Sequence, residues 1–175
     1  MFVEFGRGRG AYVGLIGAEG FAGLPVLLQA DPVPQRLVCE ISGEALRMPA
    51  ERFERLVRQT VELRNILLHY ACIRLFEETH HLACMATHPA APRVARWLLI
   101  TRDRIGSNNL PVTHEFLAQL LGLRRPYVTG IVRELQQDGH ITCERGRITI
   151  VDEAGLASTA CEDYPQLRSM YEPIS

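Results

Sequence analysis

The sequence contains no lysine, and all 19 of its basic residues are arginine. The 20 acidic residues bring the formal net charge to −1, so total charge neither favours nor excludes a nucleic-acid partner. Arginine can hold a phosphate or a guanine edge through two parallel hydrogen bonds, whereas lysine offers a single point charge. The local distribution of arginine is therefore more informative than its number.

Long apolar runs are also missing. No apolar stretch reaches the roughly 18–20 residues that span a bilayer, and the first residues, "MFVEFGRGRG", lack the apolar segment of a secretory signal peptide. The five cysteines are scattered and form no CxxC pair, which is typical of reduced thiols in a cytoplasmic protein. With 47% hydrophobic and 22% charged residues, the composition predicts a packed protein rather than a disordered one.

The sequence lacks the motifs of common enzyme classes. It has no GxxxxGK[ST] phosphate loop, and its glycines do not fit GxGxxG followed by a helix. It also has no GxSxG nucleophile motif, and no pair of carboxylates stands out. These absences predict that the protein is not an enzyme and that it needs no cofactor.

Residues 1–49 are rich in glycine. In "GAYVGLIGAEGFAGLPVLL", glycines at positions 10, 14, 17, 20 and 23 separate short apolar runs, which predicts strands that turn every few residues. Further strands are expected over 36–41 and 44–48, on either side of a turn at Ser42 and Gly43. We interpret the glycines as turn residues rather than as a phosphate cradle.

Residues 50–88 contain neither proline nor glycine. Their apolar spacing of three and four predicts a short helix over 51–58 and a long helix over 61–86. The long helix would span roughly 39 Å, and its apolar positions cover more than one face. We expect it to pack on its own chain and on a second copy in a coiled-coil dimer; packing within one chain alone is the alternative. The residues expected in the dimer seam are Leu63, Leu67, Tyr70 and Phe76.

Pro89 and Pro92 mark the best candidate domain boundary, because each lacks an amide proton and disfavours a helical residue before it. An amphipathic helix over 93–106 is predicted next. Thr113 is a suitable N-cap for a further helix that ends at Gly122. A second helix then runs to about residue 137, so the pair forms a helix-turn-helix.

Two short strands, over 141–143 and 148–151, are predicted around a tight turn and would form a wing. The second helix begins near Arg124 or Arg125, which places Pro126 in its first turn, where a missing amide proton costs no hydrogen bond. The two arginines then lie at the helix end that enters the major groove in this motif.

Positive charge gathers in the same region. Residues 93–151 hold nine arginines and five acidic residues, a local charge of +4. A basic terminal domain on a near-neutral chain is the expected signature of DNA binding. A winged helix that binds protein, with its arginines solvated, is the alternative.

The order of glycine-rich strands, a long helix and "THEFLAQLLGLRRPYVTGIVRELQQDGHITCERGRITIVD" resembles the Crp/Fnr family of bacterial transcription regulators. The resemblance implies an α+β fold with a partial cyclic-nucleotide-binding-like β-roll over 1–49, helices including the dimerisation helix over 50–87, and a winged helix-turn-helix over 88–175. It implies a homodimer that binds twofold-symmetric sites in double-stranded DNA, with RNA polymerase as a further partner. The chain would begin partway through the β-roll of such proteins.

Matched to the family residue by residue, Thr113 takes a position that contacts phosphate and Arg125 one that reads guanine. Pro126 stands where the family often has a base-reading glutamate, and Gly130 where it has a second base-reading arginine. Fewer side chains are therefore expected to contact bases directly here, and neighbouring residues are expected to compensate. The residues expected at the DNA are Thr113, Arg124, Arg125, Tyr127, Thr129, Arg133, Arg145 and Arg147.

The ligand site of the family's cyclic-nucleotide-binding members is not matched. The glutamate that binds the ribose there would follow Gly23, where this chain has Leu24 and Pro25. The arginine–serine pair for the cyclic phosphate corresponds to Arg36 and Leu37, which keep only the charge. We therefore expect no response to a cyclic nucleotide, and the sequence identifies no other effector.

Two further hypotheses remain open. The chain could be a truncated interaction module that pairs with other regulator subunits. It could also be a metal or redox sensor, because Cys84 and the nearby His80, His81 and His88 cluster at the end of the long helix with spacings that can hold zinc or haem; the main prediction assigns no metal. At the carboxyl end, a helix capped by Asp152 is expected, and the final segment "PQLRSMYEPIS" is expected to be loose.

Overall fold

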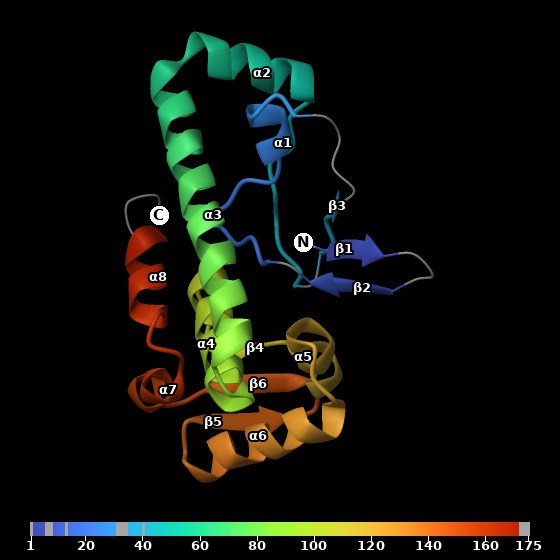
Figure 1. The fold of residues 1–175 in the computed structure, drawn as a ribbon, viewed down its shortest axis with the longest axis vertical. Coiled ribbons are helices and arrows are strands. Elements are labelled where there is room, and N and C mark those ends of the chain that lie inside the picture. The colour runs from blue at the N-terminus through green and yellow to red at the C-terminus, as the bar shows by residue number, and fades with distance from the viewer. Residues whose placement is uncertain (1, 6–8, 13, 31–34, 40, 172–175) are drawn as a thin grey trace.

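The computed structural model describes residues 2–5, 9–12, 14–30, 35–39 and 41–171. Near the amino terminus, an antiparallel sheet in the order β2-β1-β3 is formed by β1 (Phe2–Phe5), β2 (Arg9–Tyr12) and β3 (Gln35–Arg36). With a second small sheet near the carboxyl end and long helices between the two, the molecule has the α+β fold that was predicted (Figure 1).

Several strands predicted in residues 1–49 are wrong. Leu24–Leu27 form the short helix α1, since Pro25 suits the first turn of a helix. The strand predicted over 36–41 is limited to the Arg36 end of β3, and residue 40 lies outside the described residues. Residues 44–48 form no strand; Leu46 is fully exposed there, so no apolar surface stabilises one.

The two helices predicted in the middle of the chain are confirmed as α2 (Ala50–Gln59) and α3 (Val61–Thr87). Thr60 separates them because its backbone is extended, with φ −122° and ψ 99°. α3 runs along most of the molecule's long axis, and α2 lies across its upper end (Figure 1). The long rod expected from the sequence is therefore present.

The helix break expected at the two prolines is confirmed, while the domain boundary expected there stays a prediction. α3 ends at His88, whose backbone is extended (φ −98°, ψ 145°), and Pro89 is the N-cap residue of α4 (Ala90–Ile105). Pro92 lies inside the first turn of α4, where the helix needs no amide donor. α4 therefore begins about three residues earlier than predicted.

The carboxyl-terminal domain surrounds one apolar core. β4 (Asn109–Leu110) comes before α5 (His114–Leu121) and α6 (Arg125–Gln137), and β5 (Ile141–Glu144) and β6 (Arg147–Ile150) come after them; the three strands form a sheet in the order β4-β6-β5. α4, α5, α6 and the sheet bury their apolar faces against one another. The fully buried side chains include Val94, Leu98, Leu99, Leu110, Leu117, Val128, Val132, Ile148 and Leu156.

Most of the segment predicted to be loose is helical, up to Tyr171, and residues 172–175 lie outside the described residues. After α7 (Glu153–Thr159), capped by the Asp152 side chain, α8 covers Tyr164–Tyr171. α8 contacts α3 and α4 and lies beside α3 (Figure 1). Tyr164 and Leu167 are buried in these contacts. Long-range packing therefore stabilises a helix that the local sequence does not predict.

No helix among the described residues combines the length and the apolar character that crossing a membrane requires.

Candidate nucleic-acid interface

The turn between α5 and α6 is fixed by specific polar contacts. The Thr113 hydroxyl accepts a hydrogen bond of 3.1 Å from the Phe116 amide and so caps α5. Gly122 ends the helix in the left-handed region, with φ 65°, a conformation that favours glycine. From α4, the Arg93 guanidinium donates to the Leu121 carbonyl at 2.6 Å. These contacts hold α6 at a defined position relative to α4 and α5.

The start of α6 presents two exposed arginines. Arg124 is its N-cap residue with an extended backbone, and Arg125 and Pro126 open its first turn, as predicted. The Arg125 side chain is 67% exposed, and its Nε lies 3.8 Å from a carboxylate oxygen of Glu115, whose side chain is 55% exposed. Such an exposed pair contributes little energy, so the Arg125 guanidinium is available to a ligand.

The outward face of α6 is mixed. Tyr127 is 55% exposed and Arg133 is exposed. A Cβ atom added at Gly130 would meet no described atom within 4 Å, so this position faces open space. The exposed side of α6 therefore carries the guanidinium groups of Arg125 and Arg133 and the ring of Tyr127, with no side chain at Gly130.

Thr129 was predicted to face outward, and this prediction is wrong. It is half-buried, its hydroxyl donates to the Arg125 carbonyl at 3.0 Å, and the same oxygen lies 3.1 Å from His114 Nδ1. Helical periodicity in the sequence assigned Thr129 to the exposed face of α6. Its contact with His114 of α5 directs the side chain toward α5 instead. Thr129 thus joins the two helices.

His114 was not identified from the sequence. Its other ring nitrogen, Nε2, lies 3.5 Å from the Cys143 sulfur in β5. Burial lowers the pKa of His114 below its ordinary value, and the charges of Arg125 and Arg133 lower it further. The neighbouring arginines thus give this part of the surface a positive potential. The only sequence signal for His114 was its position directly after the helix cap.

The predicted wing is present. β5 pairs with β6 so that Glu144 lies opposite Arg147, and Gly146 makes the turn with φ 71°. Arg145 and Arg147 are both exposed. They add two positive charges on the same domain as α6.

The charge argument from the sequence needs correction, because four of the nine arginines in 93–151 serve the fold. Those four make polar contacts with distant residues: Arg93 with Leu121, Arg96 with Asp163, Arg102 with Glu153, and Arg104 with Glu77. The exposed ones are Arg124, Arg125, Arg133, Arg145 and Arg147. The basic surface is therefore smaller than predicted, and it is concentrated on α6 and the wing.

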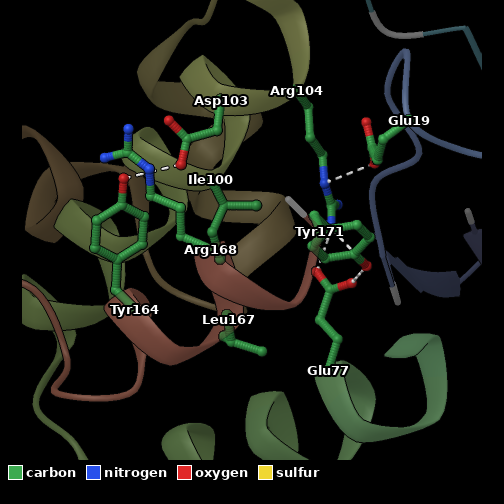
Figure 2. A pocket seen from close by; sticks show the side chains of 9 residues that line it. All are labelled: Glu19, Glu77, Ile100, Asp103, Arg104, Tyr164, Leu167, Arg168 and Tyr171. Atoms are coloured by element: carbon green, nitrogen blue, oxygen red, sulfur yellow. Dashed lines mark hydrogen bonds and ion pairs between the residues drawn. The ribbon is translucent and has the colours of Figure 1, made fainter. Parts of the chain in front are cut away.

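A cavity of about 240 Å³ lies among α3, α4, α8 and Glu19, and both charged and apolar side chains line it (Figure 2). Arg104 occupies its wall, with Nε 3.3 Å from Glu19 and Nη2 2.5 Å from Glu77. The Tyr171 hydroxyl donates to the other Glu77 oxygen at 2.5 Å. Ligand pockets usually hold about 300–1,000 Å³, and these charges already satisfy one another. We interpret the cavity as a structural network that fastens α8 to α3 and α4.

The ion pairs in this network set the protonation of Glu77. Burial alone would raise the pKa of Glu77, but the charges of Arg104 and Arg74 outweigh it and hold the pKa below its ordinary value. Arg74 contributes through a contact of 2.6 Å. Glu77 is therefore a charged group inside the fold.

The residues predicted for the dimer seam are divided between two faces of α3. Leu67 and Tyr70 are buried in the single chain, with exposed fractions of 8% and 2%, so the prediction for them is wrong: they pack on the chain's own core. Leu63 and Phe76 are half-buried. Large apolar side chains are exposed elsewhere on the helix: Val61, Ile66, Leu75, Leu82 and Met85.

One group of potential metal ligands stands out in the described part of the chain. Cys84, His88 and Cys161 offer one ligand atom each, and these atoms lie within 4.8 Å of one another. Burial, and then the hydrogen bond with Cys84, raises the pKa of Cys161 to about 12. The sequence pattern had pointed to Cys84 and the histidines but not to Cys161, which comes from the segment after α7.

Comparison with known proteins identifies the winged domain. Residues 92–159 match the model of the Crp-like helix-turn-helix domain. A Crp/Fnr-family transcriptional regulator from Thermus thermophilus shares 28% identity with the chain, over 57% of this chain and 54% of its own, with a TM-score of 0.50. A Crp/Fnr-family regulator from Eubacterium rectale also shares 28% identity, over 63% of this chain and 51% of its own, with a TM-score of 0.48.

This chain spans about half the length of the solved structures that it matches. No curated protein matched it. Residues 92–159 therefore carry a Crp-like helix-turn-helix domain, and the chain is similar to Crp/Fnr-family transcription regulators, as the resemblance in its sequence indicated.

Proposed function

We propose that the protein is a homodimeric, sequence-specific DNA-binding transcription regulator of the cytoplasm. The observation that carries this proposal is the exposed amino-terminal end of α6, with Arg124 and Arg125, on a domain that matches the Crp-like helix-turn-helix model. In helix-turn-helix proteins this end of the second helix contacts base edges in the major groove. RNA polymerase is the further partner expected of a promoter-bound regulator.

Each exposed side chain has a proposed role at the DNA. Arg125 forms the base contact, because its guanidinium can bind a guanine edge through two hydrogen bonds. Arg124 and Arg133 flank it and bind phosphate, and Tyr127 packs against the groove wall. Thr113, at the cap of α5, contacts the backbone.

The wing and Thr129 complete the proposed interface. Arg145 and Arg147 neutralise phosphates, which adds affinity without sequence information. Thr129 does not reach the DNA in this proposal, because its hydroxyl is bound to Arg125 and His114. It positions α6 against α5 instead.

We propose that two copies pair along the exposed side of α3. Positions 61, 68, 72, 75, 79 and 82 repeat with coiled-coil spacing, and with 3.6 residues per turn they lie opposite the buried Tyr70 and Ile73. Leu75 is 72% exposed and Leu82 67% exposed, so this stripe, rather than Leu67 and Tyr70, forms the seam. Pairing would place the two copies of α6 about 34 Å apart, one turn of DNA.

The proposed division of labour follows the chain. Residues 1–49 form a sensory part, 50–87 the dimerisation unit and 88–175 the DNA-binding domain. Leu24 and Leu37 stand where cyclic-nucleotide-binding members of the family carry polar ligands, so we propose that the protein does not respond to a cyclic nucleotide.

The proposal is tested by measuring affinity for a selected DNA duplex at several salt concentrations. Arg125→Ala should weaken specific binding by about 1–3 kcal/mol and leave non-specific binding nearly unchanged. Arg145→Ala should weaken binding to all sequences alike and reduce the slope of log affinity against log salt by about one. The matched control is Arg55→Ala, an exposed arginine on α2, which should change neither quantity.

A truncated module that pairs only with other proteins makes the opposite prediction. It neutralises no phosphates, so its weak association with DNA would show no regular dependence on salt. The proposed function is contradicted if wild-type protein and both α6 and wing variants bind DNA equally.

A further inference from the structure

Two buried cysteines from distant parts of the chain meet at the lower end of α3. The sulfur atoms of Cys84, in the last turn of α3, and Cys161, in the segment between α7 and α8, lie 2.9 Å apart and 77 residues apart in sequence. Both are free cysteines and both are buried. His88, one helical turn after Cys84, brings a ring nitrogen within 4.8 Å of both sulfur atoms.

We propose that Cys84, His88 and Cys161 form a binding site for a thiolate-preferring divalent metal ion of the zinc class. Two thiolates and one imidazole are a recurrent zinc ligand set, with metal–sulfur distances of about 2.3 Å and metal–nitrogen distances of about 2.0–2.1 Å. A tetrahedral ion with such bonds needs ligand atoms roughly 3.3–3.8 Å apart. The two sulfur atoms, 2.9 Å apart, are closer than this, and the His88 nitrogen lies within 4.8 Å of both, so small side-chain rotations bring the three groups onto one ion.

The surroundings of His88 indicate which of its nitrogens would bind the ion. Nε2 lies 3.6 Å from a carboxylate oxygen of Glu162, whereas Nδ1 is buried and has no hydrogen-bond partner among the described residues. Metal-binding histidines usually give their second nitrogen to a carboxylate or carbonyl, which orients the ring. Glu162 would serve this purpose, and Nδ1 would take the metal.

The alternative use of the pair is a disulfide, which requires a sulfur–sulfur distance of about 2.05 Å and an oxidant. It would leave His88 Nδ1 without a partner and would give no role to the Glu162 carboxylate. The metal site uses all four groups. A water molecule would complete the coordination shell, since zinc sites with three protein ligands keep one open position.

The position of the site suggests what the ion would do. It would join Cys84 and His88, at the end of α3, to Cys161, between α7 and α8. Because α4 begins directly after His88, the ion would fix the angle between α3 and α4. This consequence for DNA binding rests on the proposed function, whereas the metal site itself does not.

The test uses the full chain, reduced and stripped of metal with a chelator, and then titrated with Co²⁺ as a spectroscopic probe. We expect thiolate-to-cobalt charge-transfer absorption that saturates at one equivalent per chain, and displacement of Co²⁺ by Zn²⁺. Cys84→Ser and Cys161→Ser should abolish or strongly reduce that absorption, and His88→Gln should weaken binding at least about tenfold. The controls Cys39→Ser and His69→Gln, both at exposed positions, should titrate like wild type.

A second measurement needs no variant and so does not depend on a variant's folding. Zn²⁺ should protect Cys84 and Cys161 of the wild-type chain from alkylation, read by peptide mass spectrometry, while Cys39, exposed and outside the proposed dimer seam, stays reactive. The site is ruled out if the wild type shows no thiolate–cobalt absorption, if both cysteine variants keep it, or if Zn²⁺ leaves the two thiols equally reactive. None of these readouts involves DNA, so the site and the proposed function can fail separately.

Discussion

At the scale of the residue, the outer face of α6 contains a glycine that the helix itself does not need. Gly130 lies in mid-helix with open space around its Cα, and glycine there is less favourable than alanine by about 1 kcal/mol. Gly130→Ala should therefore raise the free energy of unfolding by about 0.5–1 kcal/mol, measured by urea denaturation. Gly122→Ala is the contrast, because φ 65° disfavours a side chain, and it should lower stability. Loss of stability in Gly130→Ala would show that this face is not open.

Glu77 should make folding sensitive to acid. Arg104 and Arg74 hold its pKa below the ordinary value of 4.5, so its stabilising contribution is present above about pH 4.5 and is lost as pH falls through the lowered pKa. Glu77→Gln removes that contribution and leaves Arg104 with less compensation in a buried site, at a cost of about 3–5 kcal/mol. Urea unfolding at several pH values should show stability falling below about pH 4.5 in wild type, with a flatter dependence in the variant. Equal pH dependence in both proteins would mean that Glu77 is not charged in the fold.

At the scale of the element, α3 has a buried side and an exposed apolar stripe. Changing Leu75 and Leu82 together to glutamate places like charges along the proposed seam, and should convert a dimer into a monomer without unfolding the chain, because both side chains are exposed in the single chain. Sedimentation velocity measures the change. His69→Glu introduces the same charge beside the stripe and should leave the dimer largely intact. A wild-type monomer, or a dimer that survives the double change, would contradict pairing through this stripe.

Elements with complete local signals could be predicted from the sequence, and the others could not. Thr113, Gly122 and Pro126 each mark a boundary through backbone chemistry, and α5, the turn and α6 lie where these residues indicated. α8 has no such signal. It is held by contacts such as that of Tyr171 with Glu77, 94 residues away, which no local pattern reveals.

The candidate site shows the same division. Exposure of Arg124 and Arg125 followed from the helix start, because the first turn of α6 projects from the domain. The internal pairing of Arg93, Arg96 and Arg102 did not, since their partners come from α5 and from the segments after the wing. Thr129 and Tyr70 were misplaced for a related reason: helical periodicity gives the spacing of a face but not which neighbouring element covers it.

At the scale of the whole molecule, polar contacts tie the three parts of the chain together. Arg104 of α4 contacts Glu19 near the amino terminus and Glu77 of α3, and Tyr171 of α8 joins the same group (Figure 2). The long helix, the first helix of the DNA-binding domain and the carboxyl-terminal helix thus share one buried network. A change in residues 14–30 has a direct physical route to the domain that carries α6.

The central claim is that the amino-terminal end of α6 reads DNA bases, and selection of binding sites from a random pool of duplexes tests it most directly. Wild-type protein should enrich a twofold-symmetric sequence with half-sites about 10–10.5 base pairs apart. Arg125→Ala should enrich a sequence that has lost its guanine preference at one position in each half-site. Enrichment of no sequence by the wild type, or of the same sequence by Arg125→Ala, would contradict the account.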